Sequence, residues 1–277
     1  MGPTAVLRKL YRSSRSKREA KELERFKPTL SVDSQAPALL LSPHWDDAVL
    51  DCWGLLCADG PLSLVNLFAG TPPAGTTTLW DSITGSLDSA ARTGERMAED
   101  ALALGRAGRT AANLALLDAQ YRAPGSALKL GELDMAVAAH VPQASHVYAP
   151  AGIGSHPDHL LARSYARALL AAGMPVTLYA ELPYCVLHGW PHWVDGREQQ
   201  ANRDVEVFWR SFLDAVPELP ELRSARVHRL DDEQAAQKLE AMRCYATQLP
   251  ALSYGARGLL EDPEIHRYEV SWRLQAR

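Results

Sequence analysis

The sequence predicts an α/β fold in which a mostly parallel sheet carries helices on both faces. Short apolar runs alternate with amphipathic segments along the chain, the pattern of strands that alternate with helices. Glycine and proline mark the boundaries, as Gly60 and Pro61 do between the first two runs. Two apolar runs are also followed closely by clusters of His and Asp, and ligands of such sheets bind just beyond the carboxyl ends of strands.

Taken in order, apolar runs predict strands at residues 38–42, 62–68, 112–117, 146–149 and 176–182, and an alternating pattern predicts an edge strand at 268–274. Helices are predicted at residues 48–58, 86–104, 130–140, 157–172 and 231–248. The segment FAGTPPAGTTT, which starts at Phe68, has the composition of a long loop, and long loops in compact domains are often functional.

Length and composition favour one large domain. The chain has 277 residues, of which 47% are hydrophobic, enough for a substantial core. No Gly/Ser linker, low-complexity tract or repeat divides residues 36–277, which we expect to form a single domain. The net charge of −4 argues against a nucleic-acid partner.

Residues 1–35 differ in charge from the remaining chain. Residues 1–27 hold nine Lys and Arg against three Glu, so their net charge is 9 − 3 = +6 and the other residues carry −4 − 6 = −10. We interpret residues 1–35 as a basic helical arm that lies on the acidic body of the protein or on a neighbouring subunit of a homo-oligomer. A surface that attracts anionic lipid or substrate is the alternative.

The sequence predicts a cytoplasmic protein. No apolar stretch reaches the length of a membrane span, and the start lacks the apolar core of a signal peptide. The four cysteines, Cys52, Cys57, Cys185 and Cys244, lack CxxC spacing and are expected to be buried thiols, not a disulfide framework or a zinc knuckle.

Two clusters carry the residue types of a metal site. His44, Asp46 and Asp47 follow the first predicted strand, and the segment GSHPDH, residues 154–159, follows another. His44 and Asp47 are three residues apart, so one tight turn can aim both at a single ion, with His159 as the third ligand. This set leaves positions open for water, as catalytic zinc sites do. Fe2+ is the alternative, because the set also resembles the facial triad of non-haem iron.

The other polar residues of the clusters suit acid–base chemistry. Asp46 can point at a metal-bound water and accept its proton. His156, when protonated, can stabilise the oxyanion of a tetrahedral intermediate and then pass a proton to a leaving amine. Asp158 can orient a histidine, as carboxylates behind metal ligands commonly do.

Each cluster alone has a simpler interpretation. An Asp pair after a strand is also a favoured helix N-cap, and HPDH is also a helix start with Pro at its first position. Two clusters that both follow predicted strands, and that together hold three ligands, a base and an acid, favour the metal site.

The clusters also resemble known motifs. SPHWDDAVL, residues 42–50, is similar to the [AS]-H-x-D-D motif of the PIG-L/LmbE-type zinc-dependent N-acetylglucosaminyl deacetylases, and GSHPDH is similar to their H-x-D-H motif. The resemblance implies a Rossmann-like (LmbE-like) fold and removal of acetyl groups from N-acetylglucosamine attached to lipids, inositols, thiol precursors or antibiotics. The zinc ligands, base and acid that it implies are the residues named above.

Two further residues are expected to contact the substrate. Arg92 lies in a segment similar to the family's R-x-x-E…LG helix, whose arginine tends to face the substrate; a surface position is the alternative. Trp45 lies between motif residues, where its face can stack on a pyranose, and packing is its alternative role. The chain departs from the family at Ala48, where an acidic residue is common, and at Gly154, where some members have a tyrosine.

These observations predict a hydrolase, acting on a linear amide C–N bond, that removes an N-acetyl group from an amino sugar or amino-sugar conjugate with metal-bound water as nucleophile. An amidase that acts on a larger acyl or thiol conjugate is the alternative among enzymes, and a metal-binding homologue without catalysis is the alternative outside them. A nucleotide-binding protein is disfavoured, because no GxGxxG follows the first strand and no P-loop occurs.

Overall fold

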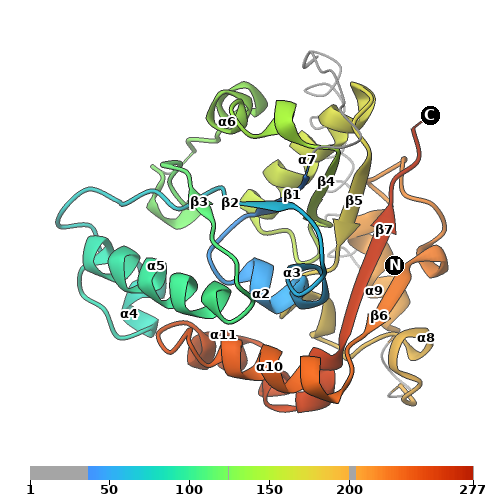
Figure 1. Ribbon diagram of the computed structural model, residues 1–277. Coiled ribbons are helices and arrows are strands. Elements are labelled where there is room, and N and C mark those ends of the chain that lie inside the picture. Colours follow the sequence, from blue (N-terminus) through green and yellow to red (C-terminus); the bar gives the residue numbers. More distant parts are fainter. Residues whose placement is uncertain (1–36, 124, 200–203, 277) are drawn as a thin grey trace, which may run out of the picture.

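The computed structural model describes residues 37–123, 125–199 and 204–276, and these form a seven-stranded sheet with its covering helices (Figure 1). The strands are β1 (Ala38–Ser42), β2 (Leu62–Asn66), β3 (Ala112–Asn113), β4 (His146–Pro150), β5 (Val176–Tyr179), β6 (Arg226–Arg229) and β7 (Tyr268–Arg273). The helices are α2 (Asp47–Asp51), α3 (Trp53–Leu56), α4 (Leu79–Ile83), α5 (Ser89–Gly105), α6 (Leu130–Val137), α7 (Pro157–Ala171), α8 (His192–Asp195), α9 (Val205–Leu213), α10 (Asp232–Met242) and α11 (Leu249–Gly255).

The sheet is built outward from β1 in both directions. β2 and β3 lie on one side of β1, and the other strands follow on the other side, in the order β3-β2-β1-β4-β5-β7-β6. The first five strands pair in parallel, whereas β7 is antiparallel to both of its neighbours. The connectivity therefore reverses between β1 and β4, and ligand-binding crevices open at such a switch point, beyond the carboxyl ends of the strands.

The central strands are apolar because both of their faces are covered. Residues 39–41 of β1, all leucine, have no exposed surface. α7 packs on β4 and β5 with α6 against it, while α2 packs on β1 and contacts α10. In Figure 1, α6 and α7 lie on one side of the sheet, and α5, α10 and α11 on the other. The predicted α/β architecture is confirmed.

Two predictions about the C-terminal region are wrong in detail. β7 is not an edge strand, because it lies between β5 and β6, and β6 forms the edge. The sequence of β6, RVHR, has no apolar run that would reveal it. The helix predicted at 231–248 is too long, because α10 ends at Met242. A separate helix, α11, begins beyond the predicted range at Leu249, with Pro250 in its first turn, where proline is tolerated.

The segment predicted as a loop, residues 68–78, contains no helix and is followed directly by the short helix α4. Thr78 is its N-cap: the Thr78 side chain accepts a hydrogen bond from the backbone N–H of Asp81, and the Asp81 carboxylate accepts one from the backbone N–H of Thr78. This reciprocal capping box is a local helix-start signal that the Thr, Pro and Gly content obscures. α9 also lies outside the predicted helices; its N-cap is Asp204.

Three expectations concern regions or properties that the described residues leave open. The basic arm, residues 1–35, lies outside the described residues, so its role and the boundary at residue 36 stay predictions. Of the helices described, none is long and apolar enough to cross a membrane, and the cytoplasmic location stays a prediction.

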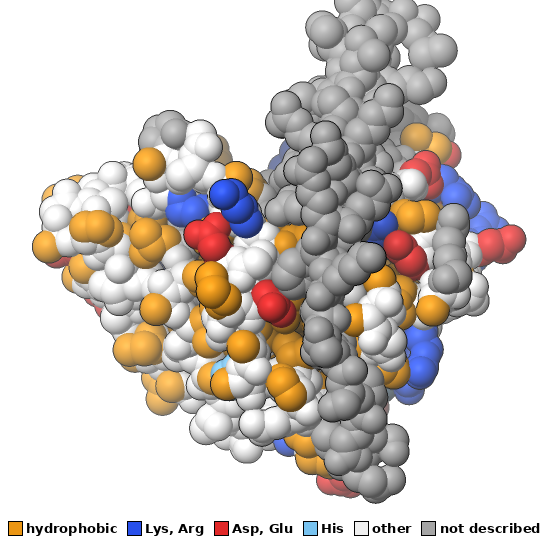
Figure 2. Space-filling model, turned by 90° about the horizontal axis from the view of Figure 1, so that it is seen from above, with side chains coloured by type: hydrophobic (Ala, Val, Ile, Leu, Met, Phe, Trp, Pro, Cys, Tyr) orange, Lys and Arg blue, Asp and Glu red, His pale blue; other side chains and the backbone are white. Residues whose placement is uncertain are grey.

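On the face seen in Figure 2, acidic and basic side chains lie near one another among apolar ones.

Candidate active site

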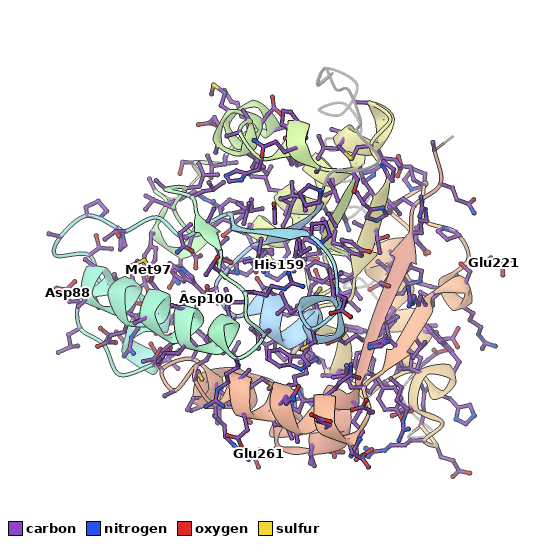
Figure 3. All side chains as sticks on the ribbon, viewed as in Figure 1. Asp88, Met97, Asp100, His159, Glu221 and Glu261 are labelled. Carbon is purple, nitrogen blue, oxygen red and sulfur yellow. The ribbon has the colours of Figure 1, made fainter. Side chains whose placement is uncertain are left out.

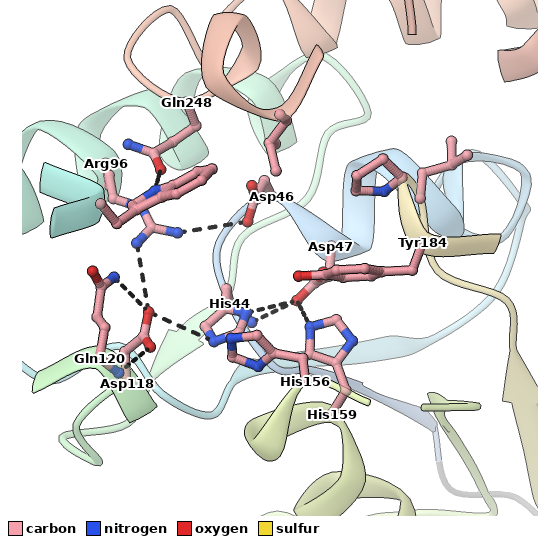
Figure 4. Close-up of a pocket in the computed structure, with 14 residues that line it drawn as sticks. His44, Asp46, Asp47, Arg96, Asp118, Gln120, His156, His159, Tyr184 and Gln248 are labelled. Carbon is pink, nitrogen blue, oxygen red and sulfur yellow. Dashed lines mark hydrogen bonds and ion pairs between the residues drawn. The ribbon is translucent and has the colours of Figure 1, made fainter. Parts of the chain in front are cut away.

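A pocket with a volume of about 210 Å³ opens at the switch point between β1 and β4 (Figure 4). Its lining combines the two His/Asp clusters with aromatic, amide and charged side chains from other elements: His44, Asp46, Asp47, Trp80, Arg96, Asp118, Gln120, His156, His159, Leu182, Pro183, Tyr184, Gln248 and Leu252. Figure 3 shows His159 near the middle of the molecule, with Asp88 far out at the start of α5.

The loop between β1 and α2 is closed by its own polar side chains. The Ser42 hydroxyl donates to the carbonyl of His44 at 2.6 Å and accepts from the backbone N–H of Ala48 at 3.1 Å. The Asp47 carboxylate accepts from the backbone N–H of His44 at 2.8 Å. This tight turn explains why a strand can be followed directly by buried charged residues: each polar group has a partner.

The three predicted ligands converge on one point. His44 Nδ1 lies 3.3 Å from Asp47 Oδ2, and His159 Nε2 lies 3.5 Å from the same oxygen. A four-coordinate zinc ion with bonds of about 2.0–2.1 Å separates neighbouring ligand atoms by about 3.3–3.4 Å. His44 and His159 also offer nitrogens within 4.8 Å of each other, in a group whose third member is His156 and not Asp47. The donors therefore fit a divalent zinc ion.

Buried carboxylates hold the outer nitrogens of both ligand imidazoles. His44 Nε2 lies 3.2 Å from Asp158 Oδ2, and His159 Nδ1 lies 3.3 Å from Glu181 Oε1. Asp158 also accepts from the backbone N–H of Ala119 and pairs with Arg122. Asp158 thus orients His44, as a carboxylate behind a metal-binding imidazole does, and not His156. Glu181 does the same for His159.

The charges of the site favour a cation at its centre. Burial opposes ionisation of Asp47, yet His159 and His44 hold its pKa well below the ordinary value. Burial also disfavours protonated imidazoles, but Asp118, Asp158 and Asp47 raise the pKa of His44 well above its ordinary value. Asp47 and Glu181 likewise raise the pKa of His159. The carboxylates thus stabilise positive charge in the pocket by more than burial destabilises it, and they would stabilise a bound metal cation in the same way.

Asp46 stands beside the ligands without joining them. Burial raises the pKa of Asp46, and Arg96, whose guanidinium lies 3.7 Å from its carboxylate, partly opposes the rise. A carboxylate with a raised pKa is suited to accept a proton near neutral pH. Its side chain is close to the centre of the pocket in Figure 4.

His156 differs from the expectation of a protonated partner. Its Nδ1 accepts the backbone N–H of Asp158 at 3.3 Å and so caps α7. Burial, together with His44 and His159, lowers the pKa of His156 to about 3. His156 is therefore neutral, and because Nδ1 is an acceptor, Nε2 carries the hydrogen. It presents a hydrogen-bond donor to the pocket, not a charge.

The structure places the two predicted substrate contacts away from the pocket lining. Arg92 donates to the carbonyl of Thr84 and pairs with Glu95, whereas Arg96, one helical turn later, faces the pocket. Trp45 is 1% exposed and lies under the Arg96 guanidinium, 4.8 Å from the ring centroid. Neither Arg92 nor Trp45 has a surface free for a sugar, so both assignments need correction.

Several lining residues lie outside the predicted set: Trp80, Arg96, Asp118, Gln120, Tyr184 and Gln248. The sequence could have revealed Arg96, because it is four residues after Arg92 and therefore lies on nearly the same face of the predicted helix. Trp80 and Gln248 are joined by a 2.8 Å hydrogen bond between segments 168 residues apart, which no local pattern reveals.

No family model and no curated protein matches this chain. Solved structures do. A triple mutant of a deacetylase of the teicoplanin biosynthetic pathway is 26% identical over 86% of this chain and 97% of its own, with a TM-score of 0.63. The zinc-inhibited form of teicoplanin deacetylase Orf2 is 25% identical over the same shares, with a TM-score of 0.64.

A third structure, the A40926 pseudoaglycone deacetylase Dbv21, shares the fold. It is 23% identical over 88% of this chain and 100% of its own, with a TM-score of 0.62.

Proposed function

We propose that this chain is a zinc-dependent hydrolase of the PIG-L/LmbE type that removes an N-acetyl group from an amino sugar or amino-sugar conjugate. Its fold, its motifs and its similarity to the teicoplanin-pathway deacetylase support the proposal. The observation that carries this proposal is the convergence of both motif loops at the β1/β4 switch point, with Asp46 beside three ligands and outside their set.

His44, Asp47 and His159 would hold the ion, with Asp158 and Glu181 fixing the imidazoles from behind. When bound, a divalent zinc ion polarises the acyl carbonyl and lowers the pKa of a water molecule. Side chains of the pocket carry out the proton transfers and stabilise the charge that develops.

Asp46 accepts a proton from the attacking water as its oxygen forms a bond to the acyl carbon. The Nε2–H of His156 donates a hydrogen bond to the acyl oxygen as that oxygen gains negative charge. Asp46 then returns the proton to the nitrogen, the C–N bond breaks, and acetate and a free amine leave. We assign the proton to Asp46 and not to His156, because the cap on α7 occupies His156 Nδ1.

The wall of the pocket suits a sugar. Trp80 offers an indole, and Gln120 offers an amide that can hydrogen bond with a hydroxyl group. Gln248 is buried and accepts a hydrogen bond from the Trp80 indole, which holds that ring in place. Of the two rivals, an amidase for a larger acyl or thiol conjugate would use the same residues, whereas a non-catalytic homologue would bind metal without turnover.

The test is release of acetate and free amine from N-acetylglucosamine conjugates by the zinc-loaded protein, with Asp46→Asn and Asp47→Asn beside the wild type. Asp46→Asn should keep its metal and lose about 100- to 10,000-fold in kcat, because it removes only the base. Asp47→Asn should lose the metal as well.

Longer N-acyl conjugates separate the rivals. Faster release of a longer acyl group would favour the amidase. A wild type that binds zinc and releases no amine from any N-acyl amino sugar would contradict the proposal.

A further inference from the structure

The hydroxyl of Tyr184 is a polar group of the pocket that the proposed mechanism does not use. Tyr184 lines the pocket, and its ring extends over Asp47 into the space beside the ligands (Figure 4). Among the hydrogen bonds of the described residues, none involves this hydroxyl. A tyrosine hydroxyl at the mouth of a buried charged site is usually paired, so an unpaired one is free to bind a ligand.

Gly154 provides the space that the Tyr184 ring occupies. A Cβ atom at position 154 would lie 2.6 Å from Cδ1, 2.7 Å from Cγ and 2.8 Å from Cβ of Tyr184, closer than real contacts allow. Gly154 also has a φ of +87°, which favours glycine. The ring therefore lies directly on the backbone of the loop that carries His156 and His159.

The segment before Tyr184 is tied to the metal-binding loops. Glu181 accepts from the backbone N–H groups of Gly152 and Ile153 and contacts His159. The backbone N–H of Leu182 donates to Asp51 at 2.7 Å. These bonds hold the start of the Tyr184–Val186 turn against the site, so the ring is positioned before any ligand arrives.

The ring stands close to both histidines of the second cluster. Its centroid is 5.6 Å from that of His159, in an edge-to-face arrangement, and 6.5 Å from that of His156. The Tyr184 ring thus lies beside the predicted ligands on the turn that follows β5, while His156 lies at the start of α7. Two donors from separate elements can bind one oxygen.

We propose that the Tyr184 hydroxyl donates a hydrogen bond to the acyl oxygen of the substrate as that oxygen becomes negatively charged. The inference rests on the proposed deacetylation and adds a second donor to His156. Tyr184 forms no bond to the substrate and transfers no proton; it stabilises charge that exists only in the transition state and the tetrahedral intermediate. The competing interpretation is that Tyr184 only packs against Gly154.

Tyr184→Phe separates these interpretations, because it keeps the ring on Gly154 and removes only the hydroxyl. With zinc-loaded protein and an N-acetylglucosamine conjugate, we expect kcat to fall by about 100-fold or more, with KM changed by less than about threefold. Zinc content and Tm should match the wild type. Tyr148→Phe, on β4 and lining a different cavity, is the control and should keep full activity.

The affinity for an analogue of the intermediate is a second measurement, which should not change if Tyr184 only packs against Gly154. A methylphosphonamidate of the same amino sugar carries a charged oxygen on tetrahedral phosphorus and imitates the intermediate. Its Kd should rise in Tyr184→Phe by about the same factor as kcat falls, while the Kd of the free amine product stays unchanged.

The outcomes are distinct. An active wild type together with an equally active Tyr184→Phe overturns this inference and leaves the deacetylation intact. A loss of kcat with unchanged Kd for the phosphonamidate also overturns it, since the hydroxyl would then not bind the charged oxygen. A zinc-loaded wild type that releases no amine overturns the proposed function, and this inference with it.

Discussion

The pocket has two walls that are built in different ways. The inner wall comes from two short segments, each a loop after β1 or β4 and the start of the helix that follows it: His44, Asp46, Asp47, His156 and His159. The outer wall, Trp80, Arg96, Asp118, Gln120 and Gln248, comes from segments spread over 168 residues of the chain.

The two walls also differ in how their side chains are held. Inner-wall groups are bound by neighbours in sequence and by buried carboxylates behind them, as Asp47 is by the His44 backbone. Outer-wall groups hold one another across elements: Trp80 donates to Gln248, and Thr78 donates to Gln120 at 2.7 Å. The difference indicates that the chemistry of the site is encoded locally, whereas its recognition of substrate depends on how distant helices pack.

The largest effect should come from a ligand of the inner wall. His159→Ala removes one of the three predicted zinc ligands, so bound zinc should be lost. Loss of a residue that only orients a ligand typically reduces activity by up to about 100-fold, and loss of the ligand itself should reduce it further. Elemental analysis and acetate release measure both. His140→Ala, beyond the end of α6, is the control. Retention of one zinc per chain in His159→Ala would show that the loops do not share an ion.

Glu181→Gln should have the next largest effect. The change keeps the size of the side chain but removes the charge behind His159, so zinc affinity should fall by about 10- to 100-fold. Chelator competition measures this. Asp51→Asn is the matched control, because the Asp51 carboxyl is also buried but accepts its hydrogen bond from the backbone N–H of Leu182 and not from a predicted zinc ligand. Equal affinities in both variants would contradict the assignment.

A smaller effect should separate the two arginines of α5. Arg96→Lys removes the planar group that lies on Trp45 and near Asp46 and Asp118, so kcat/KM should fall by about tenfold with zinc retained. Arg92→Lys should leave kcat/KM unchanged. The reverse result, with Arg92→Lys impaired and Arg96→Lys active, would show that Arg92 contacts the substrate and that Arg96 does not.

The smallest effect concerns a buried imidazole outside both walls. Burial lowers the pKa of His266 to about 4, against about 6.5 in the unfolded chain. The unfolded state therefore binds a proton that the folded state excludes, and stability falls as the pH drops from about 6.5 toward 4. At pH 5 this costs about 2 kcal/mol. Urea unfolding at pH 7 and pH 5 measures the loss, which His266→Gln should reduce.

If His266→Gln lost as much stability as the wild type between these two pH values, the acid sensitivity would have another source. Kinetic comparisons of the two walls should accordingly be made above pH 6.5, where this group does not contribute.

The inner wall is predictable from the sequence. Periodicity and turn residues locate the strands, and a His or Asp that follows a strand within a few residues must lie at its carboxyl end, because the chain has no length to place it elsewhere. For this reason the sequence predicts that His44, Asp47 and His159 lie in one pocket, and all three line it. The same locality explains the α/β prediction, since strands alternating with helices admit few other arrangements.

The outer wall depends on how distant segments pack, which the sequence does not reveal. The packing of α4 and the placement of α5 along its axis determine that Trp80 and Arg96 line the pocket. Arg92, one helical turn earlier, pairs with Glu95, and Trp45 is buried. The neutral state of His156 and the unpaired hydroxyl of Tyr184 likewise follow from neighbours far away in the chain. The burial and the hydrogen-bond pairing of a side chain depend on contacts with residues far away in the sequence, so no short stretch of sequence predicts them.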